Sequence, residues 1–479
     1  MGLMTNPKAQ KIIEKVVLST YKPLSVLLYI GTFVAIVIVS SSLFSAKTYI
    51  SENALLPGLV EKQYKSTSDI NGYANYLEGI SKTDDDIPMA WLQQTFEEIG
   101  LDTYSQNFSA SHPFLNSPED VRGTNVFAIL RAPRIAGTEA VVFSIPYRGK
   151  ALEKKMGSTN HGIALMMSLA KHFIQQSYLS KDIISDSRQR EYRGSSLGEA
   201  YYDTSSDFLA KSPLHGRSGT IMAAINLELP GRRIDHFDLR LEGLNGQLPN
   251  LDLFNVAVKL CEKEGVKATF HGQGSLTHTE LRDNYGIRYT SKTMLSNMLR
   301  QASGKPHGIH GLFLRYGIPA LTLHGIPSNS KKGDQSHSIG YILEGIFRSV
   351  NNLLERFHQS FFFYVLPETK KYVSIGLYMI PMGMLLVIPT IQALALWFLL
   401  GRKSKNIDKD EPIGEEPKGQ HHYVIPVLIG VHVCGLLLYL SPEFFVVNFS
   451  SYFGLPPTEA LVDWVRSCLY WYNLITSYK

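Results

Sequence analysis

The chain has 479 residues, more than a single simple core normally holds, so we expect more than one structural unit. Hydrophobic residues make up 44% and charged residues 19%, and the mean hydropathy of -0.04 averages a polar middle with strongly apolar flanks. The net charge of +5 is small for this length and the basic residues are scattered, which argues against a nucleic-acid-binding protein.

The first apolar run, residues 23–44, contains no charged residue and has the length of about 20 residues that a bilayer crossing requires. It is longer than the apolar part of a signal peptide and lacks an A-x-A cleavage site, so we predict an uncleaved transmembrane helix. Residues 1–22 carry four lysines and one glutamate, which predicts a cytosolic N-terminus and places the following residues in the lumen.

Residues 45–371 are long enough for one luminal domain. Apolar, strand-like runs alternate there with runs of helical spacing, which predicts an α/β sandwich with a mostly parallel sheet. The predicted strands are 126–133, 139–146, 220–229 and 320–323, and the predicted helices are 161–176, 251–264 with Asn250 as N-cap, and 339–357.

A second uncharged run, residues 372–400, predicts another transmembrane helix. The polar residues 401–422 predict a cytosolic loop, and residues 423–447 predict a third transmembrane helix. The C-terminal segment 448–479 is amphipathic and aromatic-rich, so it fits either the start of a further span or a helix on the membrane surface.

The motifs of zincins, serine hydrolases, P-loop NTPases and dinucleotide-binding proteins are all absent. His307 and His310 have a spacing that suits two metal ligands, but no third ligand is identifiable, so we favour structural loop histidines. Nothing around Cys261 indicates an activated thiolate, and a buried thiol is the preferred interpretation. Asn107 begins a sequon and is a glycosylation candidate if the domain is luminal.

Four stretches, in order along the chain, resemble the Gaa-type subunit of GPI transamidase: TYISENALLPG at 48–58, EGLNGQLPNLDL at 242–253, QASGKPHGIHGLFLRYGIPALTL at 301–323 and LLERFHQSFFFYVLP at 353–367. The resemblance implies a multi-pass glycoprotein of the endoplasmic reticulum membrane whose luminal domain is similar to two-metal zinc aminopeptidases. It implies that catalysis lies in a separate caspase-like subunit. It also implies that this subunit binds the GPI glycolipid, holds the complex together, or does both.

The resemblance also shows which peptidase ligands this chain lacks. Where the peptidases have an H-x-D pattern, residues 144–149 read SIPYRG, and no acidic residue stands at 157–160. The Glu-Glu pair corresponds to SDSRQREYRG at 185–194, Glu228 matches a later Asp in kind, and His337 is an uncertain final ligand. Because a two-metal site needs four or five ligands and a general base, we predict no catalytic, metal or cofactor-binding residues.

Two alternatives remain at this stage: an active zinc aminopeptidase of the M28 type or a peptide synthetase, and an unrelated membrane scaffold or transporter. The chain also departs from the family in two respects. Residues 185–193 are polar where a hydrophobic strand is usual, which indicates either a shortened or lost central strand or an error in the gene model. Family members usually have more C-terminal spans, so a truncated form and a functional short form are both open.

A GPI headgroup would sit at the depth of the residues that follow the first span. Tyr49 suits the interface, and Ser51 and Asn53 can hydrogen-bond to sugar or phosphate, so these three residues are the predicted GPI contact. The alternative is that they only cap a helix and anchor the chain at the interface.

Overall fold

The computed structural model describes residues 7–41, 44–65, 69–81, 88–110, 121–135, 137–148, 153, 157–188, 209–211, 215–276, 284–304, 306, 308–328, 333–410, 429–433, 435–437 and 440. The chain forms two compact units, Met1–Ala395 and Leu396–Lys479, and each is described by itself. The first unit holds all the sheets, and the described part of the second holds mainly the end of one long helix.

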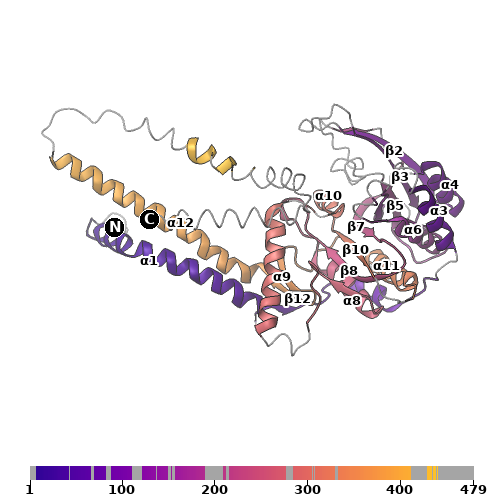
Figure 1. Cartoon of the computed structure of the whole chain (residues 1–479), viewed down its shortest axis with the longest axis horizontal. Helices are drawn as coiled ribbons and strands as arrows, with labels where there is room; N and C mark the ends of the chain where they lie inside the picture. Colours follow the sequence, from indigo (N-terminus) through magenta and orange to yellow (C-terminus); the bar gives the residue numbers. More distant parts are fainter. Residues whose placement is uncertain are drawn as a thin grey trace. The chain divides into compact units, whose positions relative to one another are not determined.

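The first half of the described chain consists of α1 (Pro7–Ser40), β1 (Ala46–Lys47), η1 (Asn53–Leu55), α2 (Leu56–Val60), α3 (Asp69–Ser81), α4 (Met89–Ile99), β2 (Asp102–Ala110), β3 (Val121–Leu130), β4 (Glu139–Pro146), α6 (Asn160–Phe173), β5 (Asp182–Arg188), β6 (Leu209–Lys211) and β7 (Thr220–Glu228). The second half consists of β8 (Ile234–Arg240), η2 (Leu244–Gly246), α8 (Leu251–Lys263), β9 (Lys267–Thr269), α9 (Asn284–Ser303), α10 (His310–Leu314), β10 (Ala320–Pro327), α11 (Ser336–Asn351), β11 (Tyr364–Glu368), β12 (Lys371–Ser374) and α12 (Ile375–Asp410). Figure 1 shows these elements along the chain.

The main sheet has nine strands in the order β6-β2-β3-β5-β4-β7-β10-β8-β9. Its centre, β5-β4-β7-β10, is parallel, whereas β2, β3 and β6 on one side and β8 against β10 on the other pair antiparallel. The predicted α/β fold is therefore confirmed, and the mostly parallel character applies to the centre of the sheet. The carboxyl ends of β4, β7 and β10 lie at one edge, where α/β proteins commonly place their sites.

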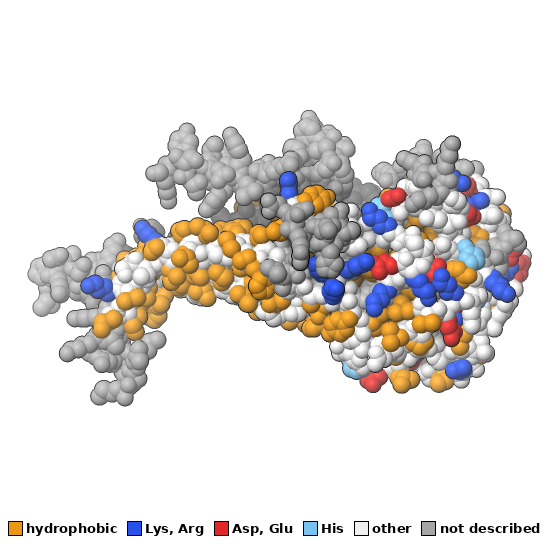
Figure 2. Space-filling view, turned by 90° about the horizontal axis from the view of Figure 1, so that it is seen from below, with side chains coloured by type: hydrophobic (Ala, Val, Ile, Leu, Met, Phe, Trp, Pro, Cys, Tyr) orange, Lys and Arg blue, Asp and Glu red, His pale blue; other side chains and the backbone are white. Residues whose placement is uncertain are grey.

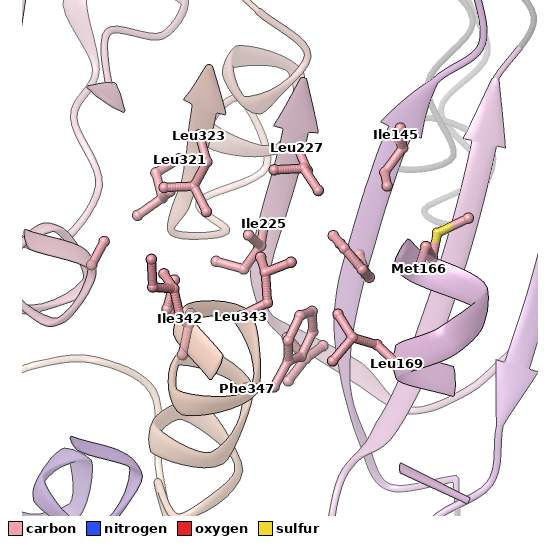
Figure 3. Packing of buried hydrophobic residues seen from close by; sticks show 14 of the residues in the cluster. Ile145, Met166, Leu169, Ile225, Leu227, Leu321, Leu323, Ile342, Leu343 and Phe347 are labelled. Atoms are coloured by element: carbon pink, nitrogen blue, oxygen red, sulfur yellow. The ribbon is translucent and has the colours of Figure 1, made fainter. Parts of the chain in front are cut away.

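Alternating side chains of the central strands face two apolar layers. Ile145, Ile225 and Leu323 belong to the larger cluster, in which α6 and α11 pack against the sheet. In Figure 3, Met166 and Leu169 of α6 and Ile342, Leu343 and Phe347 of α11 point toward these strand residues. The opposite face holds a smaller cluster with Phe313 of α10. Both faces of the central strands are apolar, as expected for parallel strands covered by helices on each side.

Several element boundaries follow the sequence pattern closely. β4 covers the predicted strand 139–146, and α8 begins after Asn250, whose side chain accepts a hydrogen bond of 3.0 Å from the Asp252 amide. The predicted helix 339–357 is too long, because α11 ends at Asn351. The Asn351 side chain accepts hydrogen bonds from the Ser180 and Lys181 amides, which fixes the end of α11 against the start of β5.

The expectation that the polar stretch 185–193 shortens or removes a central strand is wrong for its described part. β5 runs to Arg188 and pairs with β3 on one side and β4 on the other. Ser185, Asp186 and Ser187 are buried, and the Ser144 hydroxyl donates to the Asp186 carboxylate over 3.2 Å. Backbone pairing on both sides keeps the strand in place although its side chains are polar. Residues 189–193 lie outside the described residues.

A small three-stranded sheet, β1-β12-β11, joins the ends of the domain to two long helices. β1 follows α1 and pairs antiparallel with β12, which leads directly into α12. Within the described chain, residues 12–40 of α1 and 375–401 of α12 are long and apolar enough to cross a membrane. The second candidate span begins at Ile375 rather than at the predicted residue 372, because 372–374 belong to β12. Of the predicted span 423–447 the structure describes residues 429–433, 435–437 and 440, all of them helical and exposed. The segment 448–479 lies outside the described residues.

Candidate functional site

A cluster of charged side chains lies at the carboxyl ends of the central parallel strands. Glu228 closes β7, His324 is its direct neighbour on β10, and Arg148 follows the end of β4. The Glu228 Oε2 atom lies 2.8 Å from Arg148 Nη2, 2.9 Å from His324 Nδ1 and 3.7 Å from Arg240 Nη1 of β8. We refer to Arg148, Glu228, Arg240 and His324 as the strand-end cluster.

The strand-end cluster holds its carboxylate in the charged form. Burial opposes ionisation of Glu228, but the hydrogen bond from His324 and the positive charges of Arg148 and Arg240 outweigh it and lower the pKa to about 2. The side chains of Glu228 and Arg148 are each only 3% exposed. The positive charge that a bound metal ion would bring to this carboxylate is therefore already supplied by arginine.

These residues do not fit a two-metal peptidase site. Glu228 already accepts a charged hydrogen bond from Arg148, and no group of three or more His, Cys, Asp or Glu side chains in the described chain could hold a metal ion. Zinc in proteins needs about four ligands, and a catalytic site still needs three from the protein. The positive charges of the two guanidinium groups beside this single carboxylate oppose the binding of a metal cation there.

The other positions compared with peptidase ligands are engaged elsewhere. Asn160 donates to the Ser81 hydroxyl over 2.8 Å, and Asp186 accepts from Ser144. His337 is exposed, and its ring lies 4.4 Å from the ring of Tyr341. The structure therefore does not bring His337 into the strand-end cluster; the histidine that contacts Glu228 is His324.

A second polar chain joins His161, Ser336 and Asp334. The Ser336 hydroxyl donates to the Asp334 carboxylate over 2.5 Å, and the His161 Nε2 atom lies 2.8 Å from the same hydroxyl oxygen. In a hydrolase triad the carboxylate would contact the histidine, and the histidine would accept the serine proton. Here the carboxylate contacts the serine instead, so this arrangement does not generate a nucleophile.

His310 of the predicted histidine pair is completely buried. Its Nδ1 atom lies 2.8 Å from Thr322 Oγ1, and its Nε2 atom donates to the Glu242 carbonyl oxygen over 3.0 Å. Burial lowers the pKa of His310 to about 4, so the ring is neutral near pH 7. His310 thus makes contacts inside the domain, and it begins α10 rather than lying in the predicted loop. His307 lies outside the described residues.

Two further residues from the sequence have clear surroundings. Cys261 is fully buried, and burial raises the pKa of its thiol to about 12, which agrees with an unreactive thiol. Asn107 lies on β2 with an exposed side chain whose oxygen accepts from the Thr124 hydroxyl over 2.8 Å. Its glycosylation remains a prediction.

The predicted GPI contact lies in the segment between α1 and α2, and we refer to residues 48–53 as the junction segment. The amides of Ser51 and Glu52 donate to the Asp252 carboxylate in the first turn of α8, over 3.0 and 2.9 Å. The Asn255 side chain donates to the Tyr49 carbonyl oxygen over 2.7 Å. The main chain of the junction segment is therefore fixed to α8.

The side chains of the junction segment have different surroundings from one another. Glu52 is buried and accepts from the amides of His358 and Gln359 over 2.8 and 3.2 Å. Tyr49 is 51% exposed and lies near the ring of Tyr372, whereas Asn53 is exposed and Ser51 half-buried. Tyr49 and Asn53 are thus exposed on a backbone that α8 holds in place. Asn53 is the first residue of η1 rather than its cap; the N-cap is Glu52, whose side chain makes no capping hydrogen bond.

Sequence reasoning singled out Glu228 but missed its partners. Arg148, Arg240 and His324 are far apart along the chain, and only the sheet order brings them together. A usable signal is that polar residues follow or close the strands predicted at 139–146, 220–229 and 320–323. The carboxyl ends of parallel neighbours converge, so such residues are candidates for one site.

Comparison with known proteins gives a consistent family. The family model described as "Gaa1-like, GPI transamidase component" matches residues 122–475. The GPI transamidase component gaa1 of Schizosaccharomyces pombe is 34% identical over 77% of this chain, and GAA1 of Saccharomyces cerevisiae is 31% identical over 74%. These matches cover 61% and 54% of the two relatives, so the chain spans little more than half of their length.

The chain is also similar to solved structures, two of which follow. The glutaminyl cyclase of Fimbriiglobus ruber has a TM-score of 0.38 and 15% identity, covering 60% of this chain and 97% of its own. The LapA aminopeptidase of Legionella pneumophila has a TM-score of 0.39 and 12% identity, covering 65% of this chain and 78% of its own.

Proposed function

The chain belongs to the Gaa1-like family of GPI transamidase components, and from this premise we propose that it is a non-catalytic subunit of that complex in the endoplasmic reticulum membrane. In this proposal it supports attachment of GPI anchors by binding the glycolipid, by holding other subunits together, or by both. The bond-making step belongs to a separate caspase-like cysteine subunit. The observation that carries the non-catalytic role is the buried ion pair between Arg148 and Glu228.

The arrangement of described groups supports the absence of peptidase chemistry. The strand-end cluster has one carboxylate and two arginines, so it offers neither a metal ligand set nor a carboxylate free to act as a general base. Cys261 is buried with a raised pKa, and Ser336 donates to a carboxylate. None of these groups is arranged to attack a peptide bond.

The two candidate spans support a membrane location. Both helices join the same small sheet, since β1 follows α1 and β12 precedes α12. The intervening domain therefore lies on one side of the bilayer if both helices cross it. We place that side in the lumen because the residues before the first span are basic.

Affinity purification of the tagged full chain from endoplasmic reticulum membranes tests the proposed complex. We expect the caspase-like subunit to co-purify in a mild detergent. A tagged, unrelated membrane protein of the same compartment serves as the control. Recovery of the chain without that subunit, in conditions that preserve other membrane complexes, would reject the role as a component of this assembly.

Metal content and turnover distinguish the proposal from the aminopeptidase alternative. The purified full chain should contain no stoichiometric zinc by mass spectrometry and should not hydrolyse aminoacyl substrates. About two zinc ions per chain together with aminopeptidase turnover would establish the alternative. The same preparation can be assayed before and after chelation, so that adventitious metal is separated from a resident site.

The GPI headgroup contact is a finer proposal at Tyr49, Ser51 and Asn53. It is supported by the exposure of Tyr49 and Asn53 and by the fixed backbone that Asp252 and Asn255 provide. Hydroxyl and amide groups can hydrogen-bond to sugar and phosphate oxygens. The glycolipid's acyl chains would occupy the bilayer beside α1, ten residues or so earlier in the chain.

The double variant Ser51→Leu with Asn53→Ala tests this contact. It should reduce GPI recovered with the purified complex while leaving recovery of the caspase-like subunit unchanged. A matched control replaces exposed polar residues on β2 and α3, Ser105→Leu with Asn75→Ala, and should leave GPI recovery unaltered. Equal GPI recovery in the two variants rejects the contact.

A further inference from the structure

Helix α9 was not recognised in the sequence, and the structure fixes its orientation on the domain. Its buried face includes Thr293 and Asn297, and the Asn297 side chain donates to the Glu242 carboxylate over 2.9 Å. Burial opposes ionisation of Glu242, but the hydrogen bond and charge of His271 together with Asn297 lower its pKa to about 2. At the C-terminal end, the Asn245 amide donates to the Gly304 carbonyl oxygen over 3.1 Å. Helix α9 therefore cannot rotate freely about its axis.

A neighbouring face of α9 contacts the ends of both candidate spans. The hydroxyl groups of Ser291 and Ser40 lie 2.6 Å apart, and Met294 packs in one cluster with Val39. Partly buried side chains of the same cluster include Ile36 of α1 and Leu377 of α12. Figure 1 shows α9 beside the ends of α1 and α12 that join the domain. Because Ile36 and Leu377 belong to the spans, α9 lies at the level of the bilayer surface.

A third face of α9 is exposed and has an unusual composition. Tyr285, Arg288, Lys292, Leu295 and Leu299 are spaced by three or four residues and so form one stripe along the helix, which we call the α9 stripe. Its apolar members are 63%, 50% and 60% exposed, for Tyr285, Leu295 and Leu299 respectively. Arg288 and Lys292 are exposed as well. A helix face that combines leucines with basic residues and has an aromatic residue at one end is typical of helices that lie in a membrane interface.

The surroundings of the stripe favour lipid as the occupant. Figure 2 shows hydrophobic side chains covering the surface of the long apolar helices, with Lys and Arg side chains on the adjoining face of the domain. The apolar surface of the candidate spans is thus continuous with that of α9 through the cluster of Val39, Met294 and Met298. A phospholipid surface offers acyl chains to the leucines and phosphates to the basic residues.

We propose that α9 lies on the bilayer leaflet from which α1 and α12 emerge, with the α9 stripe against the phospholipids. The leucines enter the boundary between headgroups and acyl chains, Tyr285 lies at headgroup depth, and Arg288 and Lys292 extend to lipid phosphates. Three elements, α1, α12 and α9, then contact the membrane, and together they fix the tilt of the domain, which two spans alone would not do. This inference needs only that the two spans cross a bilayer, so it stands apart from the transamidase role.

Lipid-borne quenchers test this arrangement on the full chain reconstituted in phospholipid vesicles. Cys434→Ser and Cys468→Ser remove the thiols outside the described residues, and Cys261 stays because it is fully buried. A polarity-sensitive fluorophore is attached at Leu299→Cys, with Ile30→Cys in the first span as the positive control and Leu354→Cys as the exposed control. The vesicles carry a nitroxide either near the headgroup or deep in the acyl chain.

The label at residue 299 should lose fluorescence to the headgroup-level nitroxide more than to the deep one, whereas the label at Ile30→Cys should show the reverse order. The label at residue 354 should be unaffected, because Leu354 is 90% exposed outside the span-contacting cluster. In vesicles with phosphatidylglycerol, adding Arg288→Glu and Lys292→Glu should weaken quenching at residue 299, with helix content by circular dichroism unchanged.

Three results would overturn the proposal. In the first, the fluorophore at residue 299 keeps as much fluorescence as the one at residue 354, although the fluorophore at Ile30→Cys is quenched. Another is a photo-crosslinker at residue 299 that links to a protein in native membranes, which would make the stripe a subunit interface. The third is absence of quenching at Ile30→Cys, because the chain would then lack the membrane insertion on which the proposal depends.

Discussion

The strand-end cluster and the junction segment use their polar groups in opposite ways. In the strand-end cluster the side chains are engaged with one another: Glu228 is surrounded by Arg148, Arg240 and His324. In the junction segment the main chain is engaged, through the Ser51 and Glu52 amides bound to Asp252, while Tyr49 and Asn53 remain exposed. The carboxylate at the strand ends is therefore already engaged, and the segment after the first candidate span has exposed side chains.

The difference indicates where this domain can still interact. A buried ion pair contributes little net stability compared with an apolar replacement, but breaking it on one side is costly. Such a pair holds the ends of β4 and β7 together at the strand-end cluster. The junction segment is fixed by its main-chain hydrogen bonds to Asp252 and Asn255 of α8 and, among its own side chains, by the buried Glu52.

The largest effect expected from this comparison is at Arg148. Arg148→Ala leaves the buried Glu228 carboxylate without its closest cation, so the free energy of unfolding should fall by about 3–5 kcal/mol. Denaturant titration of the full chain in detergent measures it. Arg148→Met combined with Glu228→Gln should recover most of the loss, because no buried charge is left unpaired. The control Arg134→Ala, at an exposed side chain, should change stability by less than about 0.5 kcal/mol. A loss at Arg148→Ala no larger than that of the control would contradict the comparison.

The second largest effect is expected from acidification, which should lower the free energy of unfolding of the domain. Burial lowers the pKa values of His161 and His310 from 6.5 to about 4, so both rings stay neutral in the folded chain while the unfolded chain takes up protons below pH 6.5. The free energy of unfolding should thus fall between pH 7 and pH 5, by about 2 kcal/mol for each histidine. Glu228 and Glu242 titrate lower and stay charged in this window. Titrations at both pH values should show about half the wild-type dependence in His310→Gln; an undiminished dependence would exclude His310 as a source.

A smaller effect is expected at the junction segment. Asp252→Ala removes the acceptor of the Ser51 and Glu52 amides and should cost about 1–2 kcal/mol of unfolding free energy. Asp252→Asn retains one acceptor oxygen and should lose less. Identical stabilities of the two variants and the natural chain would show that the junction segment is not held by this carboxylate.

The smallest change in stability is expected for Ser51→Leu with Asn53→Ala. Because neither side chain is fully buried, the free energy of unfolding should stay within about 0.5 kcal/mol of the natural chain. The same titration verifies this, so that reduced GPI recovery can be attributed to the contact itself. A loss as large as that of Asp252→Ala would mean that these side chains help to hold the fold.

Local signals in the sequence predicted the central strands well and the outer elements poorly. β4 and β7 are nearly continuous apolar runs between turn residues, and Asn250 before α8 is a recognisable cap. β5 was misjudged because its polar residues are buried through pairing on both sides, which no single segment reveals. Helix α9 was missed because its apolar residues divide between two faces, Met294 and Met298 toward α1 and Leu295 and Leu299 outward.

The candidate site could be predicted only in part for the same reason. Glu228 is visible as a carboxylate at the end of an apolar strand, whereas its neutralisation depends on Arg148 and His324 from two other strands. The junction residues follow the first apolar run and could be located by counting from it. Their attachment to Asp252 joins positions about two hundred residues apart, which no local pattern contains.

The pairing of β1 with β12 also sets an order of events during synthesis. Ala46 pairs with Tyr372, so a nascent chain carries an unpaired edge strand until nearly the whole domain has left the ribosome. The central sheet can form beforehand, because its strands all lie between these two positions. The part nearest the bilayer is therefore completed last, and until then chaperones of the folding compartment have access to an open strand and to the uncovered side of α9.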